Sequence, residues 1–361
     1  MRTIDMKTNG SNNRTASLRD VADRAGVSVA TASRVASGSA AVRPETREKV
    51  ERAMRDLLYV PPGRTEPSGA IGLLMPEFGN PVFAALAQAM ETRATAAGFS
   101  TIICNTAGSA MREVDYVHML LERRVEGMVF VCAEITDVRG EHSHYAQLLD
   151  QGARLVFVNG SSESLPVTSV GVDERASGRM ATEHLLELGH RRIGFVAGES
   201  FALATRDKAR GREEALAPHG LDPGADVAYD AFSVEGGRRA LRRIIEGASG
   251  DGPTAVICSN DLMAIGAMQE AVALGLRVPD DLSIVGFDGI DAAAWTQPPL
   301  TTIEQPIDEI AGTAIEAMQA LVDGPGQTLP SYVFRPTLRV GGTTAAPGSP
   351  CGIQQKPNPA A

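Results

Sequence analysis

A short stretch near the N-terminus most restricts how this chain can fold. In the run Leu18–Ala25, apolar residues recur at helical spacing, which predicts a helix with one apolar face. Gly26 follows it, and glycine readily adopts the positive φ that ends a helix. Ser28 can cap a second short helix, which the pattern extends over Val29–Ala36. A helix, a tight turn that contains glycine and a second helix predict a helix-turn-helix.

A third helix completes this N-terminal unit. Pro44 suits the first turn of a helix, where its missing N–H removes no hydrogen bond. Apolar residues then recur at helical spacing up to Leu58, and the pattern ends at Tyr59. We therefore predict an all-α helix-turn-helix domain over residues 17–60.

The charge is divided unevenly along the chain. The overall net charge of −10, taken alone, argues against nucleic acid as a partner. Residues 1–61, however, carry 11 Lys and Arg against 7 Asp and Glu, a net charge of +4, so the remainder carries −14. A basic head on an acidic body can contact phosphates while the body stays away from DNA.

The pattern changes from Ala70 onward, where apolar runs alternate with helical patterns. Continuous apolar runs such as residues 128–131 are typical of strands buried on both faces, and so of a parallel sheet covered by helices. The alternation restarts near Ser169 and continues to residue 340, which predicts two successive α/β lobes. Two sets of strand ends could then face each other across a ligand cleft.

Three segments lack the apolar pattern of a core. Residues 1–16 form a polar N-terminal arm, residues 61–69 a linker rich in Pro and Gly, and residues 341–361 a tail rich in Gly, Pro and Ala. We expect the arm and the tail to be disordered. The arm lacks the apolar core of a signal peptide, no run could span a membrane, and the four cysteines show no C-x-x-C spacing. These features predict a cytoplasmic location.

The chain resembles the lac repressor (LacI/GalR) family of bacterial regulators over about residues 17–340. In the head, the matching strings are Asp20-Val21-Ala22, Ala25-Gly26-Val27-Ser28, Thr31-Ala32-Ser33-Arg34-Val35 and Thr46-Arg47-Glu48-Lys49-Val50. In the body they are Gly127-Met128-Val129, residues 188–194, residues 260–267, Ser283-Ile284-Val285-Gly286-Phe287-Asp288 and residues 298–303.

This resemblance implies a periplasmic-binding-protein-like body of two Rossmann-like lobes over residues 70–340. We place the crossings between the lobes near Val167, Asp291 and Val322. The N-lobe would then hold about 70–167 and 292–322, and the C-lobe about 168–291 and 323–340. The tail has no leucine heptad of the kind that joins dimers into tetramers in some members, so we expect a homodimer.

The resemblance also places the second helix in the major groove of double-stranded operator DNA. The two positions that select the operator in the family match Val29 and Ala30, which can touch a thymine methyl but cannot form a bidentate hydrogen bond. Arg34 could donate to guanine with its planar fork or clamp a phosphate. The other residues predicted to contact DNA are Ser28, Thr31, Ser33, Arg43 and Arg47.

The linker departs from the family pattern. Members follow a Tyr-x-Pro string with a hinge helix that inserts a leucine into the minor groove. Here Tyr59-Val60-Pro61 is present, but the segment up to Ile71 is shorter than usual and contains no leucine. We expect no typical hinge helix, because Pro, Gly and Pro interrupt the segment; Arg64 could enter the minor groove instead or contact phosphate.

Family ligand contacts can be carried over to the expected cleft. Asp288 matches a carboxylate that accepts hydrogen bonds from ligand hydroxyls, and Asn260 matches an amide with the same role. Phe232 matches an aromatic residue that stacks on the ligand. Lys208 stands where many members have arginine, and Arg206 could take its place.

A second cleft edge is expected at Asn80 and Phe83, after the first strand of the body. Phe83 and Phe232 could instead be core residues, and Asn260 could be a helix cap. An aromatic ring beside a planar carboxylate and an amide suits a sugar or another polyol better than a purine.

We therefore predict a transcriptional regulator, by default a repressor, whose operator affinity changes when a sugar-like effector binds; a ligand-dependent activator fits the same residues. A solute-binding receptor without a DNA role would need export, which the polar N-terminus opposes. An enzyme is disfavoured because the chain has neither a G-x-x-x-x-G-K-[ST] loop nor a G-x-S-x-G elbow. We expect no cofactor, and we interpret His142 and His144 as solvated loop residues rather than a metal site.

Overall fold

The computed structural model describes residues 17–36, 42–57, 69–140, 142–161, 165–248, 252–324 and 329–348. The chain divides into two compact units, Met1–Pro67 and Ser68–Ala361. The predictions for the N-terminal arm, for the linker over 61–68 and for the end of the tail lie outside the described residues.

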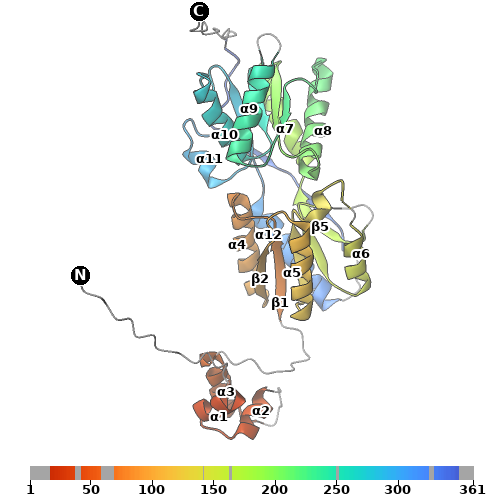
Figure 1. Ribbon diagram of the computed structural model, residues 1–361, viewed down its shortest axis with the longest axis vertical. Helices are drawn as coiled ribbons and strands as arrows, with labels where there is room; N and C mark the ends of the chain where they lie inside the picture. The colour runs from red at the N-terminus through yellow and green to blue at the C-terminus, as the bar shows by residue number, and fades with distance from the viewer. Residues whose placement is uncertain are drawn as a thin grey trace, which may run out of the picture. The chain divides into compact units, whose positions relative to one another are not determined.

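The first unit contains the predicted helices (Figure 1): α1 (Leu18–Ala25), α2 (Val29–Ala36) and α3 (Pro44–Asp56). Ser17 and Asp20 form a reciprocal capping box at the start of α1, and Gly26, at φ 66°, ends it. The helices enclose a small core whose buried members are Val21, Ala22, Ala32, Val35, Val50 and Ala53.

The second unit holds two sheets, each of six strands. The first sheet is parallel throughout, in the order β11-β5-β4-β3-β1-β2. Its strands are β1 (Ala70–Met75), β2 (Ser100–Asn105), β3 (Gly127–Val131), β4 (Leu155–Val158), β5 (Thr168–Val172) and β11 (Tyr332–Phe334). Its helices are α4 (Pro81–Ala96), α5 (Ala110–Glu122), α6 (Ser143–Asp150) and α12 (Ile307–Asp323), with a 3₁₀ turn, η1 (Glu134–Thr136), after β3.

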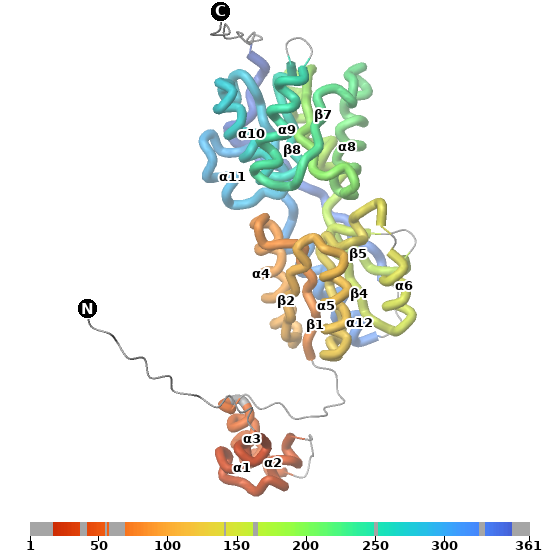
Figure 2. Tube along the Cα trace, viewed as in Figure 1, coloured from red at the N-terminus to blue at the C-terminus, as the bar shows by residue number. Residues whose placement is uncertain are grey.

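The second sheet has the order β12-β10-β9-β8-β6-β7, and only the pairing of β12 with β10 is antiparallel among its described strands. The strands are β6 (Ile193–Ala197), β7 (Val227–Tyr229), β8 (Ala255–Cys258), β9 (Ser283–Asp288), β10 (Thr301–Glu304) and β12 (Thr337–Arg339). The helices are α7 (Glu174–Glu187), α8 (Leu203–Leu216), α9 (Val234–Gly247), α10 (Asp261–Ala273) and α11 (Asp291–Trp295), with η2 (Ala217–His219) after α8. Figure 2 shows these elements as one lobe and those of the first sheet as the other.

Continuous apolar strands arise because both faces of each sheet are covered. In β1, Ile71 and Leu73 pack with Met90 of α4 and Ile315 of α12, whereas Leu74 packs with Leu120 of α5 on the opposite face. Alternate residues of the strand therefore enter two different cores, and both must be apolar.

The crossings between the lobes differ from those expected near Val167, Asp291 and Val322. The chain crosses between β5 and α7, between β10 and α12, and between β11 and β12. Thus β5 and β11 belong to the first sheet and β10 to the second, the reverse of the predicted division. A short apolar run predicts a strand, but which sheet edge accepts it depends on tertiary pairing that the run itself does not encode.

The prediction of a disordered tail is wrong for residues 341–348, which pack against the second sheet. The Thr343 side chain is fully buried, and its hydroxyl donates to the Ile284 carbonyl at 2.6 Å and accepts from the Thr301 N–H at 2.9 Å. The Ala345 carbonyl accepts from the Ser283 hydroxyl at 3.2 Å. Residues with little or no side chain let the backbone approach the sheet closely, so the same composition that indicates disorder also permits this packing.

In the described part of the chain, no helix combines the length and the apolar character that crossing a membrane requires. Cys104, Cys132 and Cys258 are free thiols, and Cys351 lies outside the described residues.

Candidate functional site

Helix α2 presents an exposed face of mixed character opposite its core face. Ala32 and Val35 are buried, whereas Val29, Ala30, Ser33 and Arg34 are exposed. The exposed residues therefore lie where a helix docked in a groove would present them.

The start of α2 is held by its own hydroxyl groups. The Thr31 N–H donates to Ser28 Oγ at 3.2 Å, and the two side-chain oxygens lie 2.9 Å apart. Arg43 is exposed just before α3, and half-buried Arg47 lies 4.0 Å from Glu51 within that helix. Ser28 is thus a helix cap in the free protein, and its predicted contact with DNA would be a separate role.

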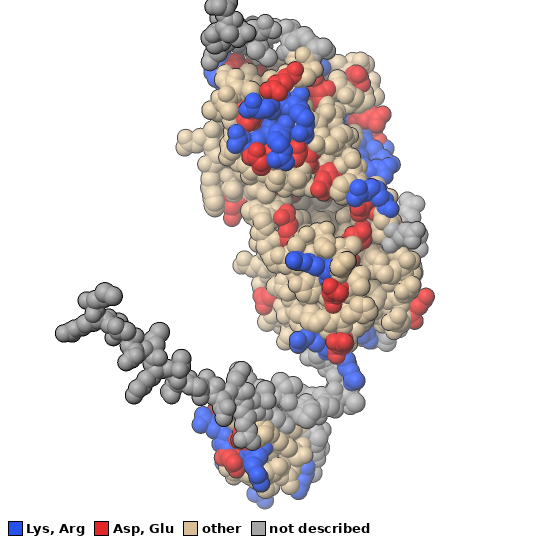
Figure 3. Space-filling model, viewed as in Figure 1, with Lys and Arg blue, Asp and Glu red and all other residues tan. Residues whose placement is uncertain are grey.

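A cavity of about 530 Å³ lies where the carboxyl ends of the two sheets' parallel strands face each other. The first lobe contributes the segments after β1, β2, β3 and β4, and the second lobe those after β6, β7, β8, β9 and β10. Figure 3 shows the hollow between the two lobes, with acidic side chains around its rim. Six of the seven residues predicted to contact the effector line this cavity: Asn80, Phe83, Lys208, Phe232, Asn260 and Asp288.

Asp288 is the centre of a hydrogen-bond network that joins the lobes. Its carboxylate accepts from Asn80 Nδ2 of the first lobe at 3.1 Å and from Gln305 Nε2 at 2.8 Å. Asn159 Nδ2 in turn donates to Gln305 Oε1 at 3.0 Å. Burial raises the pKa of Asp288 to about 6, although the bond from Asn80 and the charge of Lys208 oppose that shift.

Hydrogen bonds to the Asp261 carboxylate hold the loop after β9 in place. One carboxylate oxygen accepts the N–H groups of Gly289 and Ile290 at 2.8 and 2.9 Å, and the other accepts the Thr302 hydroxyl at 2.6 Å. Burial, followed by the nearby charge of Asp288, raises the pKa of Asp261 to about 7. Asp261 therefore positions Asp288, which itself adopts the uncommon φ of 117°.

Asn260 and Asn80 both act as helix caps and line the cavity. Asn260 Oδ1 accepts the Met263 N–H at 2.9 Å, and Asn80 Oδ1 accepts the Val82 N–H at 3.3 Å. The interpretation of Asn260 as a helix cap is thus confirmed. Because its Oδ1 is bonded to the Met263 N–H, the orientation of its amide NH₂ group is fixed as well. The rigid cap fixes the side chain that a ligand would meet.

Lys208 and Arg206 point to different places. Lys208 is buried in the cavity wall, forms an ion pair with Glu174 and lies with Nζ 3.7 Å from the centre of the Phe287 ring. Arg206 is exposed and lines a separate shallow pocket with Ser200 and Tyr229. Residues two apart on a helix face different directions, so Arg206 cannot replace Lys208, contrary to the expectation.

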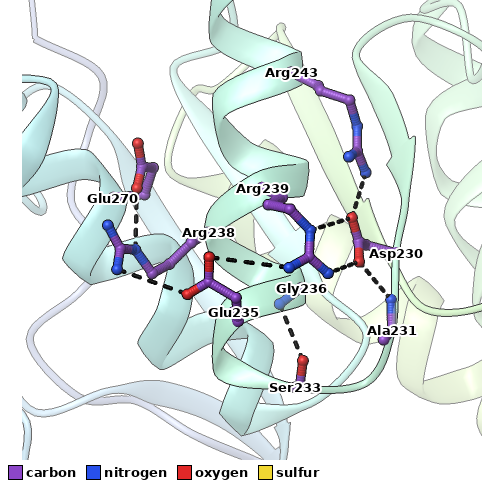
Figure 4. A network of polar contacts seen from close by, with 9 residues as sticks. All are labelled: Asp230, Ala231, Ser233, Glu235, Gly236, Arg238, Arg239, Arg243 and Glu270. Atoms are coloured by element: carbon purple, nitrogen blue, oxygen red, sulfur yellow. Dashed lines mark hydrogen bonds and ion pairs between the residues drawn. The ribbon is translucent and has the colours of Figure 1, made fainter.

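Phe83 and Phe232 are partly buried, and each packs against the core as well as lining the cavity. Phe232 lies so close to Gly198 that a Cβ at that position would overlap the ring. The loop that carries Phe232 is anchored by Asp230, whose carboxylate is bonded by Arg239 at 2.5 Å and Arg243 at 2.8 Å (Figure 4). These bonds hold the pKa of Asp230 at about 2.

Several cavity residues were missed by sequence reasoning. Asn159, Glu174 and Gln305 each stand directly after a strand or at the first residue of the helix that follows, and this position was the signal available. The acidity of the lining was also missed. Its carboxylates are Glu77, Glu113, Glu134, Asp137, Glu174, Glu199 and Asp288.

Comparison with known proteins agrees with this geometry. Residues 17–62 match the model of the bacterial regulatory proteins, lacI family, and residues 182–344 match the periplasmic binding protein-like domain. An HTH-type transcriptional regulator from the aml 5' region of Streptomyces limosus is 39% identical over 91% of this chain and 94% of its own. The HTH-type transcriptional regulator MalR of Streptomyces coelicolor is 35% identical over 92% of this chain and 98% of its own.

Solved structures extend the likeness across both units. The lac repressor dimer bound to operator and an anti-inducer shares 28% identity and a TM-score of 0.75, over 92% of this chain and 100% of that one. A complex of the regulator CelR with cellobiose shares 28% identity and a TM-score of 0.69, over 91% of this chain and 99% of that one. From the exposed helix α2, the two-lobed cleft and these matches, we conclude that the chain belongs to the lacI family of bacterial regulatory proteins.

Proposed function

We propose that this transcriptional regulator represses its target genes by binding a roughly palindromic operator as a homodimer, and that a sugar bound in the cleft changes its operator affinity. The observation that carries the proposal is the network of Asn80, Asp288 and Gln305, which spans both lobes inside the cavity. A ligand whose hydroxyls replace these bonds would change the contacts between the lobes, and such a change is what an effector must produce.

The chemistry of the lining supports a sugar. Carboxylate and amide groups accept and donate to ring hydroxyls, while Phe83 and Phe232 offer apolar faces. The solved relative in complex with cellobiose supports the same class. Lys208 is the sole cation among the described residues of the lining, and its pairing with Glu174 makes an anionic ligand less suitable.

The reading of DNA is assigned to Val29, Ala30, Thr31, Ser33 and Arg34 of α2, with Ser28, Arg43 and Arg47 contacting the backbone. Because Val29 and Ala30 offer only apolar contacts, Arg34 and the hydroxyls carry the hydrogen bonds. The homodimer is inferred because the relative on operator DNA is a dimer. The apolar side chains of Ile103 on the edge strand β2 and of Met111 and Val114 on α5 are exposed in the first lobe and are candidates for burial by a second copy.

The test is a gel-shift experiment with the full chain and the DNA upstream of its own gene. We expect binding that weakens steeply as salt rises, since phosphate contacts release counterions. Addition of the correct sugar should change the apparent affinity, and Asp288→Ala should remove that response without removing DNA binding. Failure of the intact protein to bind any DNA near its gene at low salt contradicts the proposal. Tighter binding with the sugar would indicate co-repression instead of induction.

A further inference from the structure

A loop of the first lobe reaches across to the second lobe. It comprises residues 134–140, which begin with η1 after β3, and we call it the strap. The Val138 N–H donates to the Phe201 carbonyl of the second lobe at 3.0 Å, and Asp137 and Ala202 form an antiparallel bridge. The strap therefore adds a backbone connection between the lobes, separate from the network of side chains described above.

The base of the strap is fixed in the first lobe. Ile135 is buried in the core of that lobe. The Glu134 N–H donates to a carboxylate oxygen of Glu113 at 3.1 Å, and His142 Nε2 lies 3.0 Å from the Glu134 carbonyl oxygen. Glu113 is itself buried and accepts the hydroxyl of buried Tyr145. The base therefore moves with the first lobe, and any separation of the lobes must break the contacts at the tip of the strap.

Arg139 joins the two lobes at this tip. Its guanidinium carbon lies 3.5 Å from the centre of the Phe201 ring, which is a cation–π contact between the lobes. The same guanidinium donates two hydrogen bonds to Asp137, at 2.9 and 2.7 Å. Because the Arg139 side chain is 63% exposed, this ion pair alone contributes little to stability, and its role is to hold the guanidinium over the ring.

The strap lies away from the strands that carry the crossings. Strands β5 and β11 lie at one edge of the first sheet, and β10 and β12 lie at one edge of the second. The strap follows β3 and contacts the segment after β6, and each of these two strands has a neighbour on both sides. Since the crossings are the covalent hinges of the body, contacts placed away from them must break when the lobes rotate apart.

The strap and the segment that it contacts also form part of the cavity wall. Glu134, Thr136 and Asp137 of the strap line the cavity, and so do Phe201 and Ala202 of the second lobe. Separation of these two segments would widen the cavity on that side.

We propose that the strap is a latch that stabilises the closed arrangement of the two lobes, and that the contacts of Val138 and Arg139 with Phe201 break whenever the cleft opens. This inference goes beyond the proposed function, because it concerns the opening of the cleft and holds for any ligand. It assigns Phe201 as the residue of the second lobe that receives the strap, and Arg139 as the residue that positions it.

The first test is hydrogen–deuterium exchange of the full chain, read by mass spectrometry on overlapping peptides that isolate the Val138 amide. This amide donates across the cleft, so its exchange rate reports how often the strap is released. Phe201→Leu keeps an apolar side chain but removes the ring beneath the guanidinium. We expect the Val138 amide to exchange about two- to fivefold faster in this variant, as the loss of one cation–π contact predicts. Peptides of the sheet cores should exchange at unchanged rates.

Phe78→Leu is the matched control, because Phe78 is an exposed phenylalanine of the first lobe outside the cavity lining. It should leave the exchange of the Val138 amide unchanged. If Phe201→Leu lowers the melting temperature, Arg139→Gln removes the cation at an exposed position instead. After correction for the effect of the neighbouring side chain on the intrinsic rate, that variant should also speed the exchange of the Val138 amide.

The second test replaces the contacts of the strap by a covalent bond. Asp137 and Ala202 are directly opposite each other and the bond from Val138 to Phe201 flanks them, so they form a non-hydrogen-bonded pair. The Cα atoms of such a pair lie about 4.5 Å apart, within reach of a disulfide. The double variant Asp137→Cys/Ala202→Cys should form this disulfide on oxidation and slow the exchange of the Val138 amide, and a reductant should reverse the effect. The two single variants are the controls, and peptide mapping separates the new disulfide from the four native cysteines.

Three results would overturn the inference. The first is failure of the folded double variant to form the disulfide. The second is a Val138 amide that exchanges in the unmodified protein as fast as an unprotected loop amide. The third is a Phe201→Leu variant that leaves this exchange unchanged or speeds exchange equally throughout the body. None of these measurements involves DNA or a sugar, so the proposed function can hold or fail independently of them.

Discussion

The residues proposed to contact DNA and those proposed to contact the effector lie in opposite environments. On α2, Ala30, Ser33 and Arg34 are exposed, and the small core beneath them consists of other residues. In the cleft, Asn80, Asn260 and Asp288 are 4 to 6% exposed and are bonded to neighbouring groups. A substitution on α2 should therefore alter recognition alone, whereas a substitution in the cleft also breaks the network that positions its neighbours.

This difference bears on how a ligand acts. Asn80 belongs to the first lobe and Asp288 to the second, so the bond between them stabilises one arrangement of the lobes in the free protein. A ligand must compete with that bond or extend it. Either outcome changes the relative stability of open and closed lobes.

The largest effect is expected for Asp288→Ala. It removes the acceptor of two hydrogen bonds and leaves Asn80 and Gln305 without that partner, and bonds to a charged group contribute roughly 1.5–3 kcal/mol each. Calorimetry should show sugar affinity reduced by about a hundredfold or more, with operator binding preserved in a gel shift. A variant that still responds to the sugar would show that the effector binds elsewhere.

Arg34→Ala should have the next largest effect and should act on the head only. We expect operator binding to weaken by about 1–3 kcal/mol, measured by fluorescence anisotropy, with sugar affinity unchanged. A guanine contact predicts that discrimination at one base pair is lost, and a phosphate contact predicts equal weakening on all sequences. Arg210→Ala, an exposed arginine of the body, is the control. Loss of sugar binding in Arg34→Ala would mean that the two units are not independent.

The pH dependence of sugar binding should be smaller and confined to the body. Because burial raises the pKa of Asp288 from 3.8 to about 6, its ionisation costs folding stability that is fully present above about pH 6 and is relieved progressively as the pH falls from about 6 to 3.8. Protonation also removes an acceptor for ligand hydroxyls. We therefore expect sugar affinity to fall severalfold between pH 8 and pH 5.

The variant Asp288→Asn distinguishes the titration of Asp288 from the titration of the neighbouring Asp261. Asp261 has a pKa of about 7 and faces Asp288, while Lys208, Glu174, Asn80 and Gln305 surround the other side. The asparagine variant should show a flatter profile, and any dependence that remains belongs to Asp261 or to the cavity carboxylates Glu77, Glu174 and Glu199, whose pKa values burial also raises. An unchanged profile would exclude Asp288 as the titrating group.

The smallest effect is expected for Arg206→Ala. Because Arg206 lines a separate pocket, sugar affinity should change less than twofold by calorimetry. Lys208→Ala, two residues away, leaves half-buried Glu174 without its cation and should reduce both the melting temperature and sugar affinity. Equal effects of the two substitutions would contradict the placement of α8 in the cleft wall.

The DNA-binding head and the cleft also differ in how well the sequence predicts them. The helix-turn-helix is written in one contiguous string, where Ser17, Gly26 and Ser28 mark helix ends by local hydrogen bonding and φ preference. The cleft is assembled from strand ends that are far apart in the chain. Asp288 and Asn260 could be carried over from matching strings, but Glu174, Gln305 and Phe201 depend on which strands become neighbours.

The errors share a physical cause. The predicted crossings are wrong because β5, β10 and β11 each pair at a position that only the folded sheets define. The small residues of the tail carry no apolar pattern, yet the Thr343 hydroxyl forms hydrogen bonds with Thr301 and Ile284 of the second sheet. Local sequence patterns predict helices and strands, whereas tertiary pairing determines which sheet each strand joins.

The three crossings have a consequence for synthesis and for engineering. Each sheet takes one strand from the end of the body, since β11 completes the first and β12 the second, and residues 341–348 then cover the second. Neither lobe can complete its sheet until the ribosome has released residues beyond 330. A chain cut at the first crossing, between β5 and α7, would leave the first sheet without β11, so separate expression of the first lobe calls for a rejoining of its segments rather than a truncation.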